Sequence, residues 1–107
     1  MSFTVRELPK SRQDKDSIFG WLHERSPTGA IAWLDAYDAL VERLCQDASV
    51  FGEAPESRDC QFHVRQALFK TPRGHVDRVL FFVEREVVFI LRIRGPGQAP
   101  ISREDVV

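Results

Sequence analysis

The period of the hydrophobic pattern changes once along the chain, and this change limits the fold more than any other feature. Between residues 30 and 44 the apolar residues recur at i, i+3, i+4 and i+7, directly after a Ser26-Pro27 helix start. A shorter stripe of the same period occupies residues 11–25. Beyond an irregular segment, residues 48–60, the apolar residues alternate, which is typical of strands. The chain therefore combines two successive helices with a later sheet.

The alternating part predicts three strands that follow one another in an antiparallel meander, over residues 62–69, 76–83 and 87–94. Phe3 and Val5 indicate a short N-terminal strand. Because few residues separate the two helices, they should form an antiparallel hairpin. We expect one domain over residues 1–107 with an α+β fold. In it, an N-terminal strand precedes a helical hairpin packed on one face of an antiparallel sheet whose last three strands form the meander.

Side chains of a strand point alternately to the two faces of a sheet, so each predicted strand can be divided by parity. This division predicts a helix-facing surface that contains Phe62, Val64, Leu68, Val79, Phe81, Val83, Val87, Phe89, Leu91 and Ile93. The opposite surface, which we expect to be open, carries His63, Arg65, Arg78, Arg92 and Arg94 beside Leu80, Phe82 and Ile90.

The charges are divided unevenly along the chain, although 15 Lys and Arg against 16 Asp and Glu give a net charge of −1. Residues 1–59 contain eleven acidic and seven basic residues, whereas residues 60–103 contain three acidic and eight basic ones. Twelve of the basic residues are arginine, which is suited to bidentate contacts with phosphate and carboxylate groups. The asymmetry indicates an anionic partner. The alternative is that the arginines pair with acidic residues of the first half.

Several classes of site are not expected. Cys60 and His63 have a ligand-like spacing, but no second pair accompanies them, so we predict no metal site. Gly95-Pro96-Gly97 is followed by no helical pattern and so predicts a turn rather than a phosphate loop, and we expect no cofactor. No apolar run approaches the roughly 20 residues of a membrane span, and the first ten residues contain no signal core, so we expect a cytoplasmic protein. Cys45 and Cys60 could pair, but two isolated thiols in such a chain are more often reduced.

The order of strand, helical hairpin, loop and meander resembles the RelE/ParE superfamily of toxins from type II toxin–antitoxin systems, of the plasmid-stabilisation type. The resemblance covers residues 3–98 and rests on Ala32-Trp33-Leu34, Leu40 to Leu44, Ala54-Pro55-Glu56, Val64-Arg65-Gln66, Arg78 to Phe81 and Val88 to Gly95. It implies a bacterial, growth-inhibiting toxin that is neutralised by an antitoxin protein whose C-terminal segment wraps around it. The assemblies it implies are a toxin–antitoxin hetero-oligomer or a homodimer.

The superfamily divides by target, since RelE-like members cut mRNA in the ribosome and ParE-like members poison DNA gyrase. For a nuclease, the resemblance implies that Arg78 stabilises phosphate charge. On the predicted basic face of this chain, His63 is the one plausible base, with Arg65 and Arg78 as its electrostatic partners. The remaining lysine, histidine and tyrosine residues of that branch have no counterparts, because Tyr37 lies on the predicted core stripe and the tail offers only Arg103 and acids.

We therefore expect a ParE-like toxin that inhibits DNA gyrase by binding, through Arg65, Arg78, Arg92 and Arg94. A ribosome-dependent mRNA interferase is the first alternative, with the ribosome and mRNA as its target. A family member that still binds its antitoxin but is no longer toxic is the second.

Overall fold

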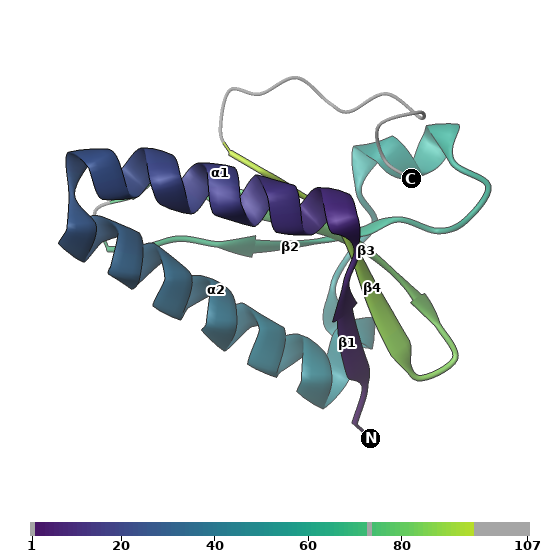
Figure 1. Cartoon of the computed structure of the whole chain (residues 1–107). Helices are drawn as coiled ribbons and strands as arrows, with labels where there is room; N and C mark the ends of the chain where they lie inside the picture. The colour runs from purple at the N-terminus through teal and green to yellow at the C-terminus, as the bar shows by residue number, and fades with distance from the viewer. Residues whose placement is uncertain (1, 73, 96–107) are drawn as a thin grey trace.

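The computed structural model describes residues 2–72 and 74–95, so the predicted turn at Pro96-Gly97 and the residue Arg103 lie outside it. One strand is followed by two helices and then by three strands, as Figure 1 shows, with two short 3-10 helices inside the segment expected to be irregular. The elements are β1 (Thr4–Glu7), α1 (Pro9–Arg25), α2 (Pro27–Asp47), η1 (Ala48–Val50), η2 (Pro55–Asp59), β2 (Arg65–Phe69), β3 (Asp77–Glu84) and β4 (Val87–Arg94).

The four strands form one sheet in the order β1-β4-β3-β2. The meander of β2, β3 and β4 is antiparallel, as predicted, but β1 pairs with β4 in parallel from Thr4 opposite Val87 to Glu7 opposite Ile90. Short turns force β2, β3 and β4 to alternate in direction, whereas the whole helical hairpin separates β1 from the meander and leaves its direction unrestricted. The α+β class and the element order are confirmed, and the sheet is mixed rather than wholly antiparallel.

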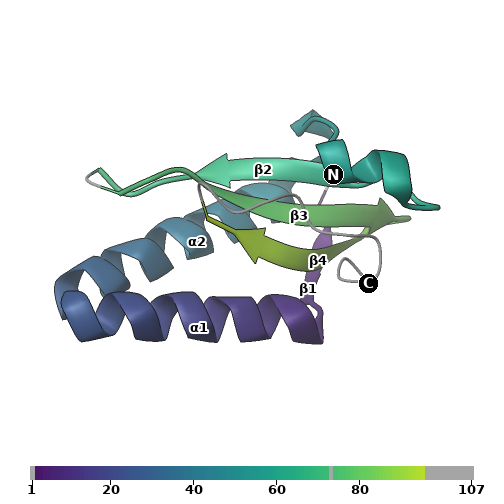
Figure 2. The same ribbon diagram turned by 90° about the horizontal axis from the view of Figure 1, so that it is seen from above.

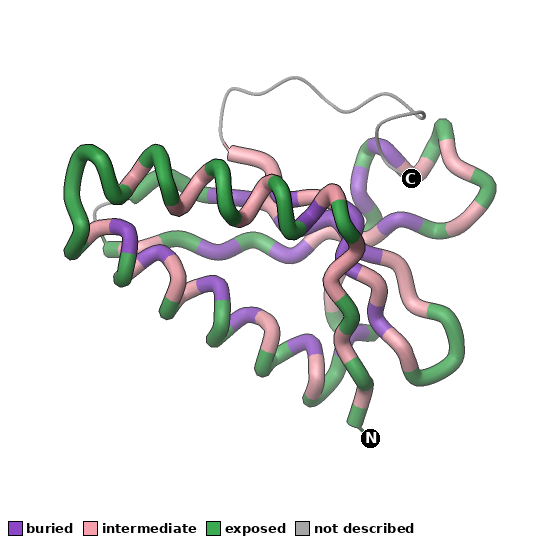
Figure 3. Tube along the Cα trace, in the orientation of Figure 1, coloured by how far each residue is buried: buried purple, intermediate pink, exposed green. Residues whose placement is uncertain are grey.

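Both helices cover the same face of the sheet, as Figure 2 shows. The predicted start of α2 is confirmed, because the Ser26 hydroxyl accepts a hydrogen bond of 3.0 Å from the Gly29 N–H and Pro27 takes the first helical position. Buried positions recur along α2 in Figure 3, while α1 is mostly exposed or half-buried. The main core consists of Trp33, Tyr37, Leu40, Leu44, Ala48, Ala67, Phe69, Val79, Phe81, Val88, Ile90 and Ile93.

The predicted faces are correct for β3 and wrong for β2 and for most of β4. In β2 the side chains that pack on the helices are Ala67 and Phe69, while Leu68 is exposed. The Phe69 ring lies 5.7 Å from the Trp33 ring, and this aromatic contact sets the face of the strand. Parity within one strand cannot decide which of its two faces meets the helices, and here the larger ring faces them.

In β4 the predicted parity fails because of a β-bulge. The pairing of β3 with β4 shifts between Leu80 and Phe81, so that Leu91 becomes an additional residue on β4. Before the bulge Val88 and Ile90 face the helices, and the expectation for Val87, Phe89 and Leu91 is wrong. After it Ile93 faces them, as expected.

The face opposite the helices is not open, since a second, smaller core lies on it. Ala54, Val64, Leu80 and Leu91 are fully buried there, and Phe62, Phe82, Cys60 and Leu8 pack around them. Phe62 and Val64 were expected on the helix side, but they precede β2 in the segment that carries η2 and fold over this opposite face. Among the described residues, no helix has the length and the apolar composition that a membrane crossing requires.

Candidate functional site

Arg78 projects from β3 onto the face with the smaller core and binds a buried carboxylate. Its Nη1 and Nη2 atoms donate hydrogen bonds of 3.0 and 2.8 Å to the two carboxylate oxygens of Glu56, and Nη1 donates a further bond of 3.0 Å to Gln66 Oε1. The Glu56 side chain, which comes from η2, is 1% exposed. A carboxylate with so little access to water requires a charged partner, so this pair fixes η2 to the sheet.

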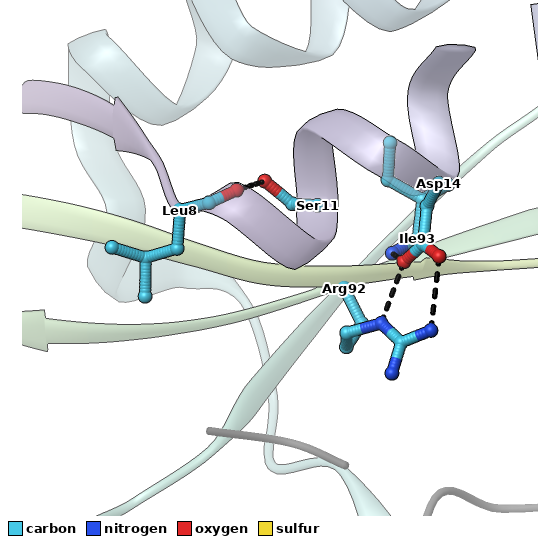
Figure 4. A network of polar contacts seen from close by, with 5 residues as sticks. All are labelled: Leu8, Ser11, Asp14, Arg92 and Ile93. Carbon is cyan, nitrogen blue, oxygen red and sulfur yellow. Dashed lines mark hydrogen bonds and ion pairs between the residues drawn. The ribbon is translucent and has the colours of Figure 1, made fainter. Parts of the chain in front are cut away.

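Arg92 forms the second bidentate pair, with Asp14 of α1. Figure 4 shows Arg92 Nε and Nη2 directed at the Asp14 carboxylate, at distances of 2.7 and 2.9 Å. Asp14 Oδ2 also accepts a bond of 2.9 Å from the Ile93 N–H. Pairing with β1 ends at Ile90, so Asp14 supplies an acceptor to the part of the β4 edge that β1 does not reach.

The same corner contains a helix start that the sequence pattern did not reveal. Leu8 continues the β1 ladder by donating its N–H to the Ile90 carbonyl at 3.0 Å, and the fully buried Ser11 donates its hydroxyl proton to the Leu8 carbonyl at 2.7 Å. These two bonds carry the chain from β1 directly into α1, which begins at Pro9. The position of Asp14 opposite Arg92 follows from this tight connection.

Three of the predicted target-binding arginines therefore share a sheet face. Arg78 is the cross-strand partner of Arg94, and Arg92 is that of Leu80, whose side chain lies in the smaller core. Two like charges directly opposite each other on a sheet are unfavourable. The buried Glu56 carboxylate on Arg78 offsets this repulsion.

Arg65 and His63 do not join these arginines, which corrects the predicted basic face. Arg65 is paired with Phe81, a main-core residue, so it belongs to the helix-facing side of β2, where its Nη1 donates a bond of 2.6 Å to the Phe51 carbonyl. His63 precedes β2, and its Nε2 lies 3.5 Å from Glu53 Oε2 on the surface. The parity argument failed for His63 because β2 begins only at Arg65. It failed for Arg65 because β2 turns the opposite face from the expected one toward the helices.

The sequence does not identify the individual acidic partners of the arginines. It does leave open that the arginines pair with acidic residues of the first half. That alternative holds for Arg78 and Arg92. No cluster of three or more His, Cys, Asp or Glu residues suited to a metal ion occurs within residues 2–72 and 74–95.

A groove lies elsewhere on the molecule, near the end of the helical hairpin at which α1 passes into α2, and beside the turn before β3. Its volume is about 730 Å³, and its walls include Ile18, Trp21, Leu22, Trp33, His75 and Asp77. Asp77 is 9% exposed, and its Oδ2 accepts a bond of 2.8 Å from the Trp33 indole N–H. Burial raises the pKa of the Asp77 carboxyl, while the Trp33 bond and the nearby His75 act in the opposite direction.

The raised pKa of Asp77 predicts a pH-dependent cost to folding. The folded state binds the Asp77 proton more tightly than the unfolded chain, so this group lowers stability as pH rises from the ordinary carboxyl pKa through the raised one. Asp77→Asn keeps an oxygen acceptor for Trp33 and removes the charge. We expect the variant to gain free energy of unfolding relative to wild type as pH rises from about 3 to about 7. Urea unfolding of both proteins across this range measures the difference, and a constant difference would contradict the prediction.

No protein-family model matches the chain, and the searches of curated proteins and of solved structures also gave no match.

Proposed function

We propose that the chain is the toxin of a type II toxin–antitoxin module of the RelE/ParE type, that it acts in the bacterial cytoplasm, and that it inhibits DNA gyrase by binding. The fold class and the element order on which the resemblance rests support this proposal. The observation that carries the choice of binding over chemistry is the state of Arg78, whose guanidinium is held by Glu56 and Gln66.

RNA cleavage through the 2′-hydroxyl needs a base within hydrogen-bond reach of the substrate and a cation beside the phosphate. The carboxylate at Arg78 accepts two bonds from that guanidinium and is almost inaccessible to solvent, so it is poorly placed to take a proton from a substrate. His63 lies beside Glu53, whereas Arg65 donates to the Phe51 carbonyl and Arg78 donates to Glu56 and Gln66. This separation favours a toxin that binds its target without cleaving RNA.

A supercoiling assay with purified DNA gyrase tests the proposal. We expect the wild-type protein to inhibit supercoiling, and His63→Ala to inhibit it equally, because the exposed imidazole makes only a surface contact with Glu53. Circular dichroism of both proteins checks that the fold is retained. Absence of inhibition at every protein concentration would refute the gyrase proposal.

The surface pair of His63 and Glu53 is the observation that favours the nuclease alternative, because an imidazole beside a carboxylate can serve as a general base. Primer extension on translated mRNA distinguishes the two mechanisms. Cleaved transcripts that disappear with His63→Ala would establish the nuclease instead. Normal growth of cells that express the chain alone would favour a non-toxic family member over both mechanisms.

A further inference from the structure

The side chains that line the groove between α1, α2 and the turn before β3 are suited to binding a partner. Ile18 and Leu22 of α1 line it, and the Trp21 indole at its rim is 55% exposed. The Arg25 guanidinium stacks on the Trp21 ring at 3.6 Å and donates a bond of 2.8 Å to the Trp21 carbonyl, so this large exposed ring is held in place. An ordered aromatic rim loses little conformational entropy when a partner binds.

The wall of the groove contains a carboxylate with unused bonding capacity. The Trp33 indole N–H donates a hydrogen bond to Oδ2 of Asp77, whereas a carboxylate can accept about four hydrogen bonds. Neither oxygen of the Asp77 carboxylate is both fully buried and without a hydrogen-bond partner. Asp77 lines the groove, so its other oxygen is placed to accept a hydrogen bond from a ligand there.

The charge of the groove determines which ligand fits. Among the described residues that line it, only His75 and Asp77 are titratable, and none of these described residues is lysine or arginine. Apolar walls around one ionised carboxylate suit a ligand that presents a basic group between apolar groups. When the carboxylate and the basic group are buried together, the attraction between them is stronger than in water. The groove differs in this respect from the sheet face opposite the helices, where Arg78, Arg92 and Arg94 lie.

We propose that this groove binds a helical segment of a partner protein that presents one arginine or lysine within an apolar stripe. The basic side chain bonds to the other carboxylate oxygen of Asp77, and the apolar side chains pack on Ile18, Trp21 and Leu22. The site and its ligand class go beyond the proposed toxin function and do not depend on it.

A set of three peptides tests the proposal with the full-length protein. The first is a short capped helical peptide with an apolar stripe and a single arginine, and in the other two citrulline or glutamate replaces the arginine. Trp21 and Trp33 line the groove, so intrinsic tryptophan fluorescence reports binding directly. We expect the arginine peptide to bind about tenfold more tightly than the citrulline peptide, and the glutamate peptide to bind most weakly.

Two charge variants locate the effect. Asp77→Asn keeps an acceptor for the Trp33 indole. In this variant the arginine and citrulline peptides should bind with about equal affinity. Asp35→Asn removes the same charge from an exposed position of α2 and should leave the preference unchanged. Trp21→Ala, at an exposed rim position, should weaken the arginine and citrulline peptides equally.

Failure of all three peptides to bind, or an arginine preference that persists in Asp77→Asn, would overturn the proposal. Two further results would overturn the proposal as well, because each would assign the groove to another occupant. A wild-type dimer in analytical ultracentrifugation that Trp21→Ala dissociates would assign the groove to a second copy of the chain. Tighter peptide binding by Arg103→Glu would assign it to the chain's own residues 96–107. None of these outcomes depends on gyrase inhibition, so the two proposals fail separately.

Discussion

Arg78→Ala should lower the free energy of unfolding by about 3 kcal/mol, because it leaves the Glu56 carboxylate buried without its charged partner. The full range for breaking a buried pair is about 3–5 kcal/mol, and the 22% exposure of the Arg78 side chain places the expectation at the lower end. The Gln66 amide oxygen also loses a donor. Urea unfolding at neutral pH, followed by circular dichroism, measures the change.

Two controls separate the ion pair from general effects of mutation. Arg58→Ala removes a guanidinium from an exposed position of the same 3-10 helix and should change stability by less than about 0.5 kcal/mol. The double variant Arg78→Leu with Glu56→Leu removes both charges, so it should recover most of the loss of the single variant. A single variant as stable as wild type would show that Glu56 does not depend on Arg78.

This prediction affects how an arginine-to-alanine result is interpreted in any functional assay. Loss of activity in Arg78→Ala is the expected result for an unfolded protein as well as for a folded protein that has lost a contact with its target. Growth assays with this variant therefore need a measurement of stability beside them. His63 is better suited to a test of catalysis, because it is more than half exposed.

The charge asymmetry of the sequence is partly cancelled inside the fold. Pairs of Arg78 with Glu56 and of Arg92 with Asp14 each join a base from the second half to an acid from the first. The asymmetry therefore indicates internal pairing across the sheet at these positions, and only the cationic surface that remains is available to an anionic partner. Net charge and charge order could not distinguish these cases, because partners 22 and 78 residues apart are set by tertiary structure.

Local signals predicted the elements, whereas their faces depended on distant contacts. The Ser26 cap and the stripe from Ala30 to Leu44 are local, and they located α2 correctly. The bulge at Leu91 follows from the pairing of β3 with β4 and has no local signal such as a glycine. For this reason Val88 and Ile90 face the helices against expectation.

The candidate sites show the same division. Arg78, Arg92 and Arg94 were expected on one sheet face and lie there, because the bulge restores the predicted parity at the end of β4. Arg65 was placed on the wrong face, since the parity of residues 62–69 does not decide which of their two faces meets the helices. The groove at Asp77 was not predicted at all, because two helices and a turn that are far apart in the sequence form it.

Asp14→Ala should lower the free energy of unfolding by about 2–3 kcal/mol, the second large effect we expect. The variant removes both bonds to Arg92 and the acceptor of the Ile93 N–H, all in a mostly buried corner. Bonds to charged groups contribute about 1.5–3 kcal/mol each, but they share one carboxylate here and are not additive. Chemical denaturation measures the loss, and hydrogen exchange at Ile93 should accelerate.

Two variants of the same helix distinguish the bonds of Asp14 from its charge. Asp14→Asn keeps one oxygen that can accept from the Ile93 N–H and loses the ion pair, so we expect about half the effect of alanine. Asp16→Ala removes an exposed acid two residues away and should change stability by less than about 0.5 kcal/mol. If Asp14→Ala proved as mild as Asp16→Ala, α1 would not depend on this contact for its attachment to the β4 edge. Retention of slow exchange at Ile93 in that variant would lead to the same conclusion, because the N–H would then have another acceptor.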